Sequence, residues 1–393
     1  MILIQNGTIL TMTGENYEPG DLLIEGTKIK KIAKHINLPD GDTTTIIDAT
    51  GCIVTPGLIE AHCHVGITEA KMGKEGDDCN ECTKPLTPWL RALDAINPMD
   101  AAFDDAVQAG ITSVMVGPGS SNVVGGQFLF MKTKGDRVID HLTVLEPAAM
   151  KVAFGENPKA AFGEQNVMPM TRMAIAGMLR QELFHAKEYL KKKKQAEKKH
   201  EDFEPDFSYE SWIPVLEQKI PLKVHAHRTD DILTAIRIAK DFDLKITLDH
   251  CTEGHLIAKE IAASGFPAIV GPDLASRDKI EVQNMAFKTA GILNKEGVLV
   301  AITTDHPVSL IQCLPVCAGL AAKYGLGKEE ALKAITINAA KICQVDKLVG
   351  SLEEGKDADI AIFDGFPLEL STTCLYTFIN GRLEFNLQDS SNS

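Results

Sequence analysis

From residue 58 to about residue 345, strand-length runs of apolar residues alternate with segments of helical length. The runs are ITSVMVG, AAMKVAFG, PLKVHAH, LKITLDH, FPAIVG and VLVAITTDH. Strands that are apolar on both faces must be covered on both faces, and a helical segment after each strand supplies that cover. The pattern therefore predicts an α/β chain whose central part, residues 57–345, is a parallel (β/α)8 TIM barrel.

The two ends of the chain have a different pattern. Residues 1–56 contain short expected strands separated by Gly, Asn, Asp and Pro turn signals, and residues 346–393 return to the same β pattern. We therefore expect the two ends to build one small, discontinuous β-sandwich domain. Within the barrel, the Lys-rich segment near 171–212 has helical apolar spacing, and its KKKKQAEKK run is expected to be a solvated helix face.

The charge of the chain restricts its partners. Forty Lys and Arg residues against 54 Asp and Glu residues give a formal net charge of −14, which repels phosphate backbones and anionic lipids. We expect a small-molecule substrate, with neither nucleic acid nor a membrane as partner. A cytoplasmic location is expected, because the first residues lack a secretory signal pattern and the nine cysteines are scattered. Cys79 and Cys82 form a CxxC pair, with no second pair to complete a zinc site.

Two histidines stand one residue apart in the first run of the barrel, GLIEAHCHVG. Side chains alternate along a strand, so His62 and His64 point the same way, with Cα atoms roughly 6.5 Å apart. That separation allows both imidazoles to bind one ion. A single buried histidine is more often a hydrogen-bonded core residue, so the pair favours a metal site without establishing it.

Further histidines and a carboxylate stand at the carboxyl ends of later runs, where barrel enzymes place their catalytic groups. His225 lies in LKVHAH, His250 ends ITLDH, and Asp305 lies in AITTDH. With His62 and His64 they give four imidazoles and a carboxylate, a set that suits zinc or another divalent metal such as manganese, iron or cobalt. His227 shares a face with His225, so we expect it to contact substrate or carry a proton.

These motifs resemble those of a known family. VTPGLIEAHCH is similar to the first-strand signature of the amidohydrolase superfamily, and HAH, LDH and TTDHP are similar to its fifth, sixth and eighth strands. GSLEEGKDADIAIFDG resembles its return strand. The resemblance implies a (β/α)8 barrel with a small β-sandwich, metal-assisted hydrolysis and a homo-oligomer. It makes the five residues metal ligands, with Asp305 as general base and His250 and His227 beside it in the catalytic site.

Lys151, in AAMKVAFG, decides between one metal ion and two. It looks similar to the carboxylated, bridging lysine of the dipeptidase-like branch of the superfamily. Burial lowers the pKa of a lysine and frees its amine to capture carbon dioxide. The alternative is a lysine whose stem is buried at a strand end while its amine reaches solvent.

Three residues are candidates for substrate contacts. Asn122 and Gln127 belong to GPGSSNVVGGQ, a Gly-rich stretch that follows an expected strand and lacks the P-loop pattern. Arg228 follows HAH and could pair with a substrate carboxylate, although a surface salt bridge is the default expectation for it.

Within the superfamily, the chain looks most like imidazolonepropionases and Xaa-Pro and Xaa-Arg dipeptidases. It departs from the former at HAH, where they have HAE, and from the latter at KVAFGENPK. We therefore predict a metal-dependent hydrolase of a C–N bond in a cyclic amide or peptide-like substrate, using one or two ions, zinc by preference. The alternatives are a catalytically silent, oligomeric scaffold protein and a mononuclear deaminase that does not use Lys151.

Overall fold

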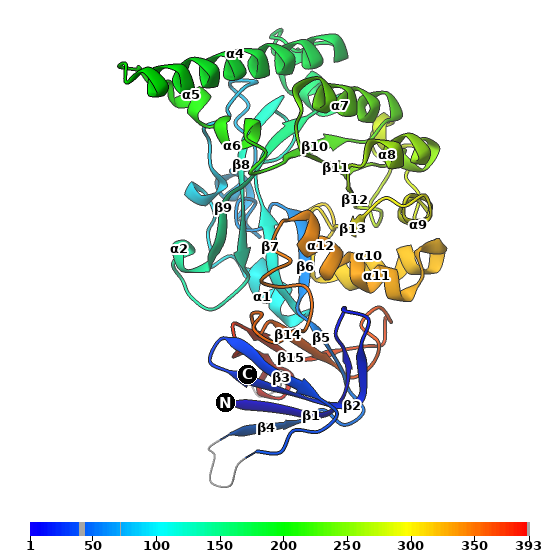
Figure 1. Ribbon diagram of the computed structural model, residues 1–393. Coiled ribbons are helices and arrows are strands. Elements are labelled where there is room, and N and C mark those ends of the chain that lie inside the picture. The colour runs from blue at the N-terminus through cyan, green and yellow to red at the C-terminus, as the bar shows by residue number, and fades with distance from the viewer. Residues whose placement is uncertain (39–43, 71, 391–393) are drawn as a thin grey trace.

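The computed structural model describes residues 1–38, 44–70 and 72–390, and two eight-stranded sheets organise the chain. One sheet curls into a nearly closed barrel, shown in the upper part of Figure 1. Its strands are, in spatial order, β6 (Leu58–Cys63), β7 (Ile111–Val116), β8 (Val124–Lys132), β9 (Thr143–Ala153), β10 (Leu222–Ala226), β11 (Ile246–His250), β12 (Ala268–Val270) and β13 (Val300–Ile302). The first and last strands meet where the His64 N–H donates to the carbonyl of His306 at 2.9 Å.

One strand of the barrel runs against the others. β8 is antiparallel to both β7 and β9, while the other neighbouring pairs are parallel. An antiparallel neighbour can be joined by a short loop, and residues 117–123 make that connection between β7 and β8. The predicted α/β barrel is therefore confirmed, with one reversed strand that the apolar runs do not reveal.

Helices cover the outside of the barrel and connect its strands (Figure 1). They are α1 (Ala101–Gln108), α2 (Ile139–Leu142), α3 (Glu156–Gly163), α4 (Arg172–Lys199), α5 (Phe207–Glu210), α6 (Ile213–Leu216), α7 (Thr229–Phe242), α8 (Ala258–Ser264), α9 (Thr289–Lys295), α10 (Leu314–Ala321), α11 (Lys328–Ala334) and α12 (Ile337–Ile342). The short α13 (Leu387–Ser390) follows the last strand. No helix among the described residues is long and apolar enough to cross a membrane.

The Lys-rich segment contains the long helix α4. The Thr171 side chain caps it by accepting from the Ala174 N–H at 3.1 Å. Ile175, Leu179 and Leu183 are buried at a spacing of four residues, so one stripe of the helix packs on the protein. An ion pair of 2.8 Å from Arg180 to Asp241 joins α4 to α7.

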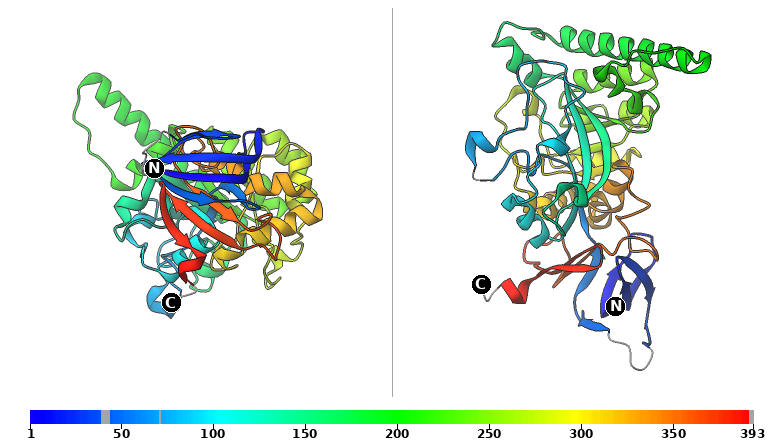
Figure 2. Two further views of the ribbon diagram at one scale, coloured as in Figure 1. Left: turned by 90° about the horizontal axis from the view of Figure 1, so that it is seen from below. Right: turned by 90° about the vertical axis from the view of Figure 1, so that its left-hand side faces the viewer.

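The second sheet is built from both ends of the chain, as the blue and red strands in Figures 1 and 2 show. Its strands are β1 (Ile2–Leu10), β2 (Asn16–Glu25), β3 (Lys28–Ala33), β4 (Thr45–Asp48), β5 (Ile53–Pro56), β14 (Ile360–Phe363), β15 (Cys374–Ile379) and β16 (Arg382–Asn386). The two ends meet where β5 pairs antiparallel with β14. Ile4, Val54 and Phe378 lie in its buried core.

A single glycine permits the passage from this sheet into the barrel. Gly57 lies between β5 and β6, and its N–H donates to the carbonyl of Asp359 at 2.9 Å. A Cβ atom at this position would come within 2.2 Å of the Thr112 hydroxyl. The close approach of the Thr112 side chain to this backbone therefore requires glycine, and it fixes where β6 begins.

Candidate metal centre

At the end of the first strand of the barrel, the protein holds two imidazoles by their Nδ1 atoms. The Nδ1 atom of His62 lies 2.8 Å from Oδ2 of Asp249, and Nδ1 of His64 lies 2.7 Å from the carbonyl oxygen of Gly117. These contacts orient both rings and direct Nε2 toward the interior of the site. Oδ1 of Asp305 lies 3.4 Å from Nε2 of His62 and 3.3 Å from Nε2 of His64. His62, His64 and Asp305 thus form a first group of candidate ligands.

Asp305 occupies a tight turn just after β13. Its backbone is left-handed, with φ of 51°, and its N–H donates to the Thr303 hydroxyl at 2.9 Å. Burial opposes ionisation of the carboxyl, but His250 and His64 outweigh burial and lower the pKa of Asp305. Oδ2 lies 3.9 Å from Nδ1 of His250, so the carboxylate faces both sets of histidines.

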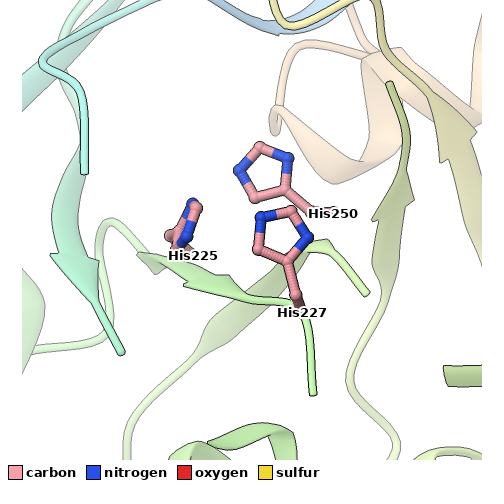
Figure 3. A group of neighbouring side chains, drawn as sticks. All are labelled: His225, His227 and His250. Atoms are coloured by element: carbon pink, nitrogen blue, oxygen red, sulfur yellow. The ribbon is translucent and has the colours of Figure 1, made fainter. Parts of the chain in front are cut away.

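The second group consists of His225, His227 and His250 (Figure 3). The ring centroid of His225 lies 4.6 Å from the ring centroids of His227 and His250. The centroids of His227 and His250 lie 4.9 Å apart. Nδ1 of His227 is 2.7 Å from the Thr252 hydroxyl, and Nδ1 of His250 is 2.9 Å from the Gly271 carbonyl. Burial lowers the pKa of His227 to about 4 and holds the pKa values of His225 and His250 well below the usual value for histidine. All three are therefore neutral imidazoles, the form that binds metals.

Lys151 lies on β9, fully buried beside the first group. Its Nζ atom is 3.3 Å from Nε2 of His62. Burial lowers the pKa of Lys151 to about 8, against the attraction of Asp249 and Asp305. The amine can therefore shed its proton near physiological pH, which is the chemical requirement for capturing carbon dioxide.

The donor atoms fit divalent metal ions. Among the described residues, neither ring nitrogen of His225 nor Oδ1 of Asp305 has a hydrogen-bond partner, although each is buried. Buried polar atoms are rarely left unpaired. Two ligands of one tetrahedral zinc ion lie about 3.3 Å apart when each bond is about 2.0–2.1 Å long. The contacts of Asp305 with His62 and His64 match that separation, so the residues suit a metal better than direct hydrogen bonds.

Several residues that support the site are not apparent from sequence motifs. Lys223, opposite Lys151 in the β9–β10 register, is buried with its Nζ atom 3.2 Å from Oδ2 of Asp249. The sequence positions of Lys223 and Asp249 nevertheless indicate that they lie near the site. Lys223 precedes His225 by two residues and so shares its strand face, and Asp249 directly precedes His250. Glu281 lies in the loop after β12, and no sequence pattern indicates that it is near the site.

Cys79 also reaches the first group. Its thiol is buried and hydrogen-bonds with His64 and Thr68. Burial raises the pKa of Cys79, but His64 outweighs that effect and the net shift is downward. Cys82, the other half of the CxxC pair, is exposed. The two thiols therefore have different surroundings.

The three residues proposed for substrate binding contact the protein itself. The Asn122 amide donates to the carbonyls of Glu81 at 2.6 Å and Lys84 at 2.7 Å, and the Gln127 amide donates to that of Pro88 at 3.1 Å. Both hold the segment before α1 against the barrel. Nε of Arg228 forms an exposed ion pair of 3.0 Å with Asp230. A substrate role for these residues stays a prediction.

Comparison with known proteins agrees with this arrangement. The amidohydrolase family model matches residues 53–386. An amidohydrolase from Thermotoga maritima MSB8, of known crystal structure, is 40% identical and superposes with a TM-score of 0.94, covering 98% of this chain and 100% of that one. The imidazolonepropionase of Thermoplasma volcanium is 25% identical over 97% of both chains.

A longer relative is also similar. The amidohydrolase tasK of Hapsidospora irregularis is 26% identical over 93% of this chain, which spans only 40% of that protein. The resemblance drawn from the strand motifs is confirmed by a family match over most of the chain and by a near-complete structural superposition. The chain belongs to the amidohydrolase family.

Proposed function

We propose that this protein is a metal-dependent hydrolase that cleaves a C–N bond in a small cyclic amide or a peptide-like substrate. The observation that carries the proposal is the position of Asp305. Its Oδ1 atom lies 3.3–3.4 Å from both first-strand histidines, and its Oδ2 atom lies 3.9 Å from His250 of the second group. One carboxylate therefore lies beside histidines of both candidate ligand groups.

The residues divide the chemistry between them. A divalent ion held by the histidines supplies Lewis acidity, which lowers the pKa of a nearby water and polarises the scissile carbonyl. Asp305, whose pKa is lowered, is ionised at neutral pH and can accept the proton of that water. It then returns the proton to the leaving nitrogen. Burial keeps the imidazoles of His225, His227 and His250 neutral and excludes bulk water from the reacting atoms.

Lys151 supports a site with two ions. We propose that its amine attacks the carbon of carbon dioxide, forming an N–C bond and releasing one proton, and that the resulting carbamate would add oxygen ligands for the ions held by the histidines. The support is its complete burial, its pKa of about 8 and its distance of 3.3 Å from His62. If the site held a single ion, a carbamate at Lys151 would have no second ion to bind.

The substrate class rests on two further points. A cavity of about 270 Å³ lies next to the site, lined by residues that include Cys79, Leu90, Pro118 and Gly125. A cavity of this size suits a small molecule better than a folded chain. The imidazolonepropionase relative, similar over nearly its whole length, supports C–N hydrolysis as the reaction type.

The variant Asp305→Asn tests the proposal. It keeps the shape of the side chain and removes the base, so kcat on a substrate found by screening dipeptides and cyclic amides should fall by about 10³-fold or more. The melting temperature of the metal-stripped variant should stay near that of the metal-stripped wild type. Substantial residual turnover in this variant would refute the assigned role of Asp305.

A further inference from the structure

A carboxylate from a distant loop reaches the second histidine group. Glu281 lies in a short helical turn, Ile280–Val282, within the loop that joins β12 to α9, and it is 1% exposed. Its Oε1 atom is 3.6 Å from Nε2 of His225 and 3.8 Å from Nε2 of His227. Glu281 is therefore an acidic neighbour of both β10 histidines, although it is far from them in sequence.

The backbone around Glu281 is built to admit this carboxylate. Its Oε2 atom accepts the Glu156 N–H at 2.8 Å, and its own N–H donates to the Glu156 carboxylate at 3.3 Å. Gly155 has φ of 88°, and a Cβ atom there would lie 2.6 Å from Oε2 of Glu281. One oxygen is thus fixed by the start of α3, and the other is left facing the histidines.

The distances from Oε1 leave space for one ion between the carboxylate and the two imidazoles. Separations of 3.6 and 3.8 Å are too long for hydrogen bonds between a carboxylate and an imidazole. They are close to the separation of about 3.3 Å expected for ligands of one tetrahedral zinc ion. His225, which has no hydrogen-bond partner on either ring nitrogen among the described residues, lies nearest to the carboxylate.

We propose that Glu281 is a metal ligand that completes the second group, His225, His227 and His250, as a site of three imidazoles and one carboxylate. The inference rests on the proposed metal dependence and extends it to a residue outside the strand motifs. Four such ligands satisfy zinc, which also accepts a fifth, so the set leaves room for a carboxylated Lys151. The ion would then tie loop 271–288 to β10 and β11.

Zinc binding to the full chain tests this assignment. Protein stripped with a chelator is titrated with Zn²⁺ against a chromophoric chelator, for the wild type, Glu281→Gln and Glu253→Gln. The glutamine at 281 keeps the acceptor for Glu156 but loses the charge, so one of the two ions should bind more than about tenfold more weakly. Glu253 is a matched control, since it is buried and accepts the Thr229 N–H at 2.9 Å but belongs to neither ligand group.

The neighbouring lysine provides a second control. Nζ of Lys279 lies 3.4 Å from Oε1 of Glu281, so a purely structural ion pair is the competing explanation for this carboxylate. Lys279→Met removes that pair and no ligand, and it should bind both zinc ions as the wild type does. Tryptic cleavage after Arg277 should be faster in Glu281→Gln with zinc than in the wild type with zinc, because the loop is no longer tied down.

The outcomes separate the inference from the proposed function. Wild-type zinc affinity at every site in Glu281→Gln overturns the role of Glu281 and leaves the hydrolase proposal intact. The role of Glu281 is also overturned if the wild type binds a single zinc ion and Glu281→Gln binds that ion with the same affinity. A wild type that binds no zinc contradicts the metal-dependent function itself. Should Glu281→Gln fail to fold by circular dichroism, Glu281→Asp, which withdraws the carboxylate by one methylene, replaces it with the same expected loss.

Discussion

His62 is held by a buried ion pair behind it. Asp249 lies 2.8 Å from its Nδ1 atom and 3.2 Å from Nζ of Lys223, and both charged side chains are almost completely buried. The Lys223 ammonium also donates to the Ala61 carbonyl at 3.1 Å, on the same strand as His62. The pair therefore orients the histidine and anchors the strand that carries it.

Removing one member of this pair should destabilise the fold. Asp249→Asn leaves the Lys223 charge buried without its partner, and such a loss costs about 3–5 kcal/mol. Urea unfolding of the metal-free protein measures the change. The double variant Asp249→Asn with Lys223→Met removes the stranded charge and should recover part of that loss. A single variant within about 1 kcal/mol of the wild type would show that the pair carries little stability.

Lys151 makes a separate prediction about carbon dioxide. Because its pKa is about 8, part of the protein has a free amine near that pH, and bicarbonate should raise metal uptake by stripped protein. Lys151→Met has no amine, so its uptake should not respond to bicarbonate. Metal content of both proteins, reconstituted in carbon-dioxide-depleted buffer with and without bicarbonate, provides the measurement. An equal response in the two proteins would contradict carboxylation.

For single residues, the sequence predicts the site residues that lie on strands but not those that lie in loops. His62 and His64, as well as His225 and His227, share a strand face by the alternation of side chains, so their grouping follows from spacing. Glu281 reaches the second group only through the path of loop 271–288, which no periodicity describes. The sequence also leaves open whether His227 contacts substrate or carries a proton.

At the scale of elements, a buried cluster of charges joins β8 of the barrel to the chain leading into β14. Nζ of Lys132 lies 2.9 Å from Asp357 and 2.8 Å from Asp359, and Asp359 accepts the Asn380 N–H at 2.9 Å. Burial opposes the charge on Lys132, but the two carboxylates outweigh it and raise its pKa. Lys132 and Lys28 in turn lower the pKa of Asp357 against the effect of burial.

These shifts predict how stability depends on pH. The depressed pKa of Asp357 contributes stability that is present above its unfolded value of about 3.9 and is lost as the pH falls through the folded value. The raised pKa of Lys132 contributes stability that is present below about 10.4 and is lost as the pH rises through the folded value. Lys132→Met should therefore lose the added stability between these limits. Unfolding free energies across the pH range check this, and a wild-type profile in the variant would contradict it.

The elements show where the sequence was informative. Apolar runs predicted the barrel strands because burial on both faces is a property of composition. They did not predict the antiparallel strand β8, because its first residues, 124–127, belong to the Gly-rich stretch that was expected to follow a strand, and the direction of a strand leaves no mark in its composition. The reversal brings Gln127 against the segment before α1, where it contacts Pro88.

At the scale of the whole molecule, two features of the chain stay predictions. The expected homo-oligomer would show as a multiple of the 42.6 kDa chain mass in light scattering, and the chain mass alone would contradict it. The expected cytoplasmic location is a matter for cell fractionation.

Bound metal should also stabilise the whole fold, because ions that bind the folded chain alone shift unfolding by mass action. Stripping the protein with a chelator should lower its melting temperature, and adding zinc back should restore it. The control is Asp305→Asn, which lacks one ligand of the first group and should recover less. No change on stripping would show that the histidine groups hold no ion in the folded protein.

The central claim is that two ions occupy two groups of ligands on one barrel. The most direct test is the metal content per chain, measured by plasma mass spectrometry on protein purified with bicarbonate and without chelator or metal-affinity resin. About two ions per chain is the expected result, with Lys151 carboxylated between them. About one would contradict the two-ion site and favour a mononuclear deaminase. None after reconstitution would contradict the hydrolase itself and leave a catalytically silent scaffold.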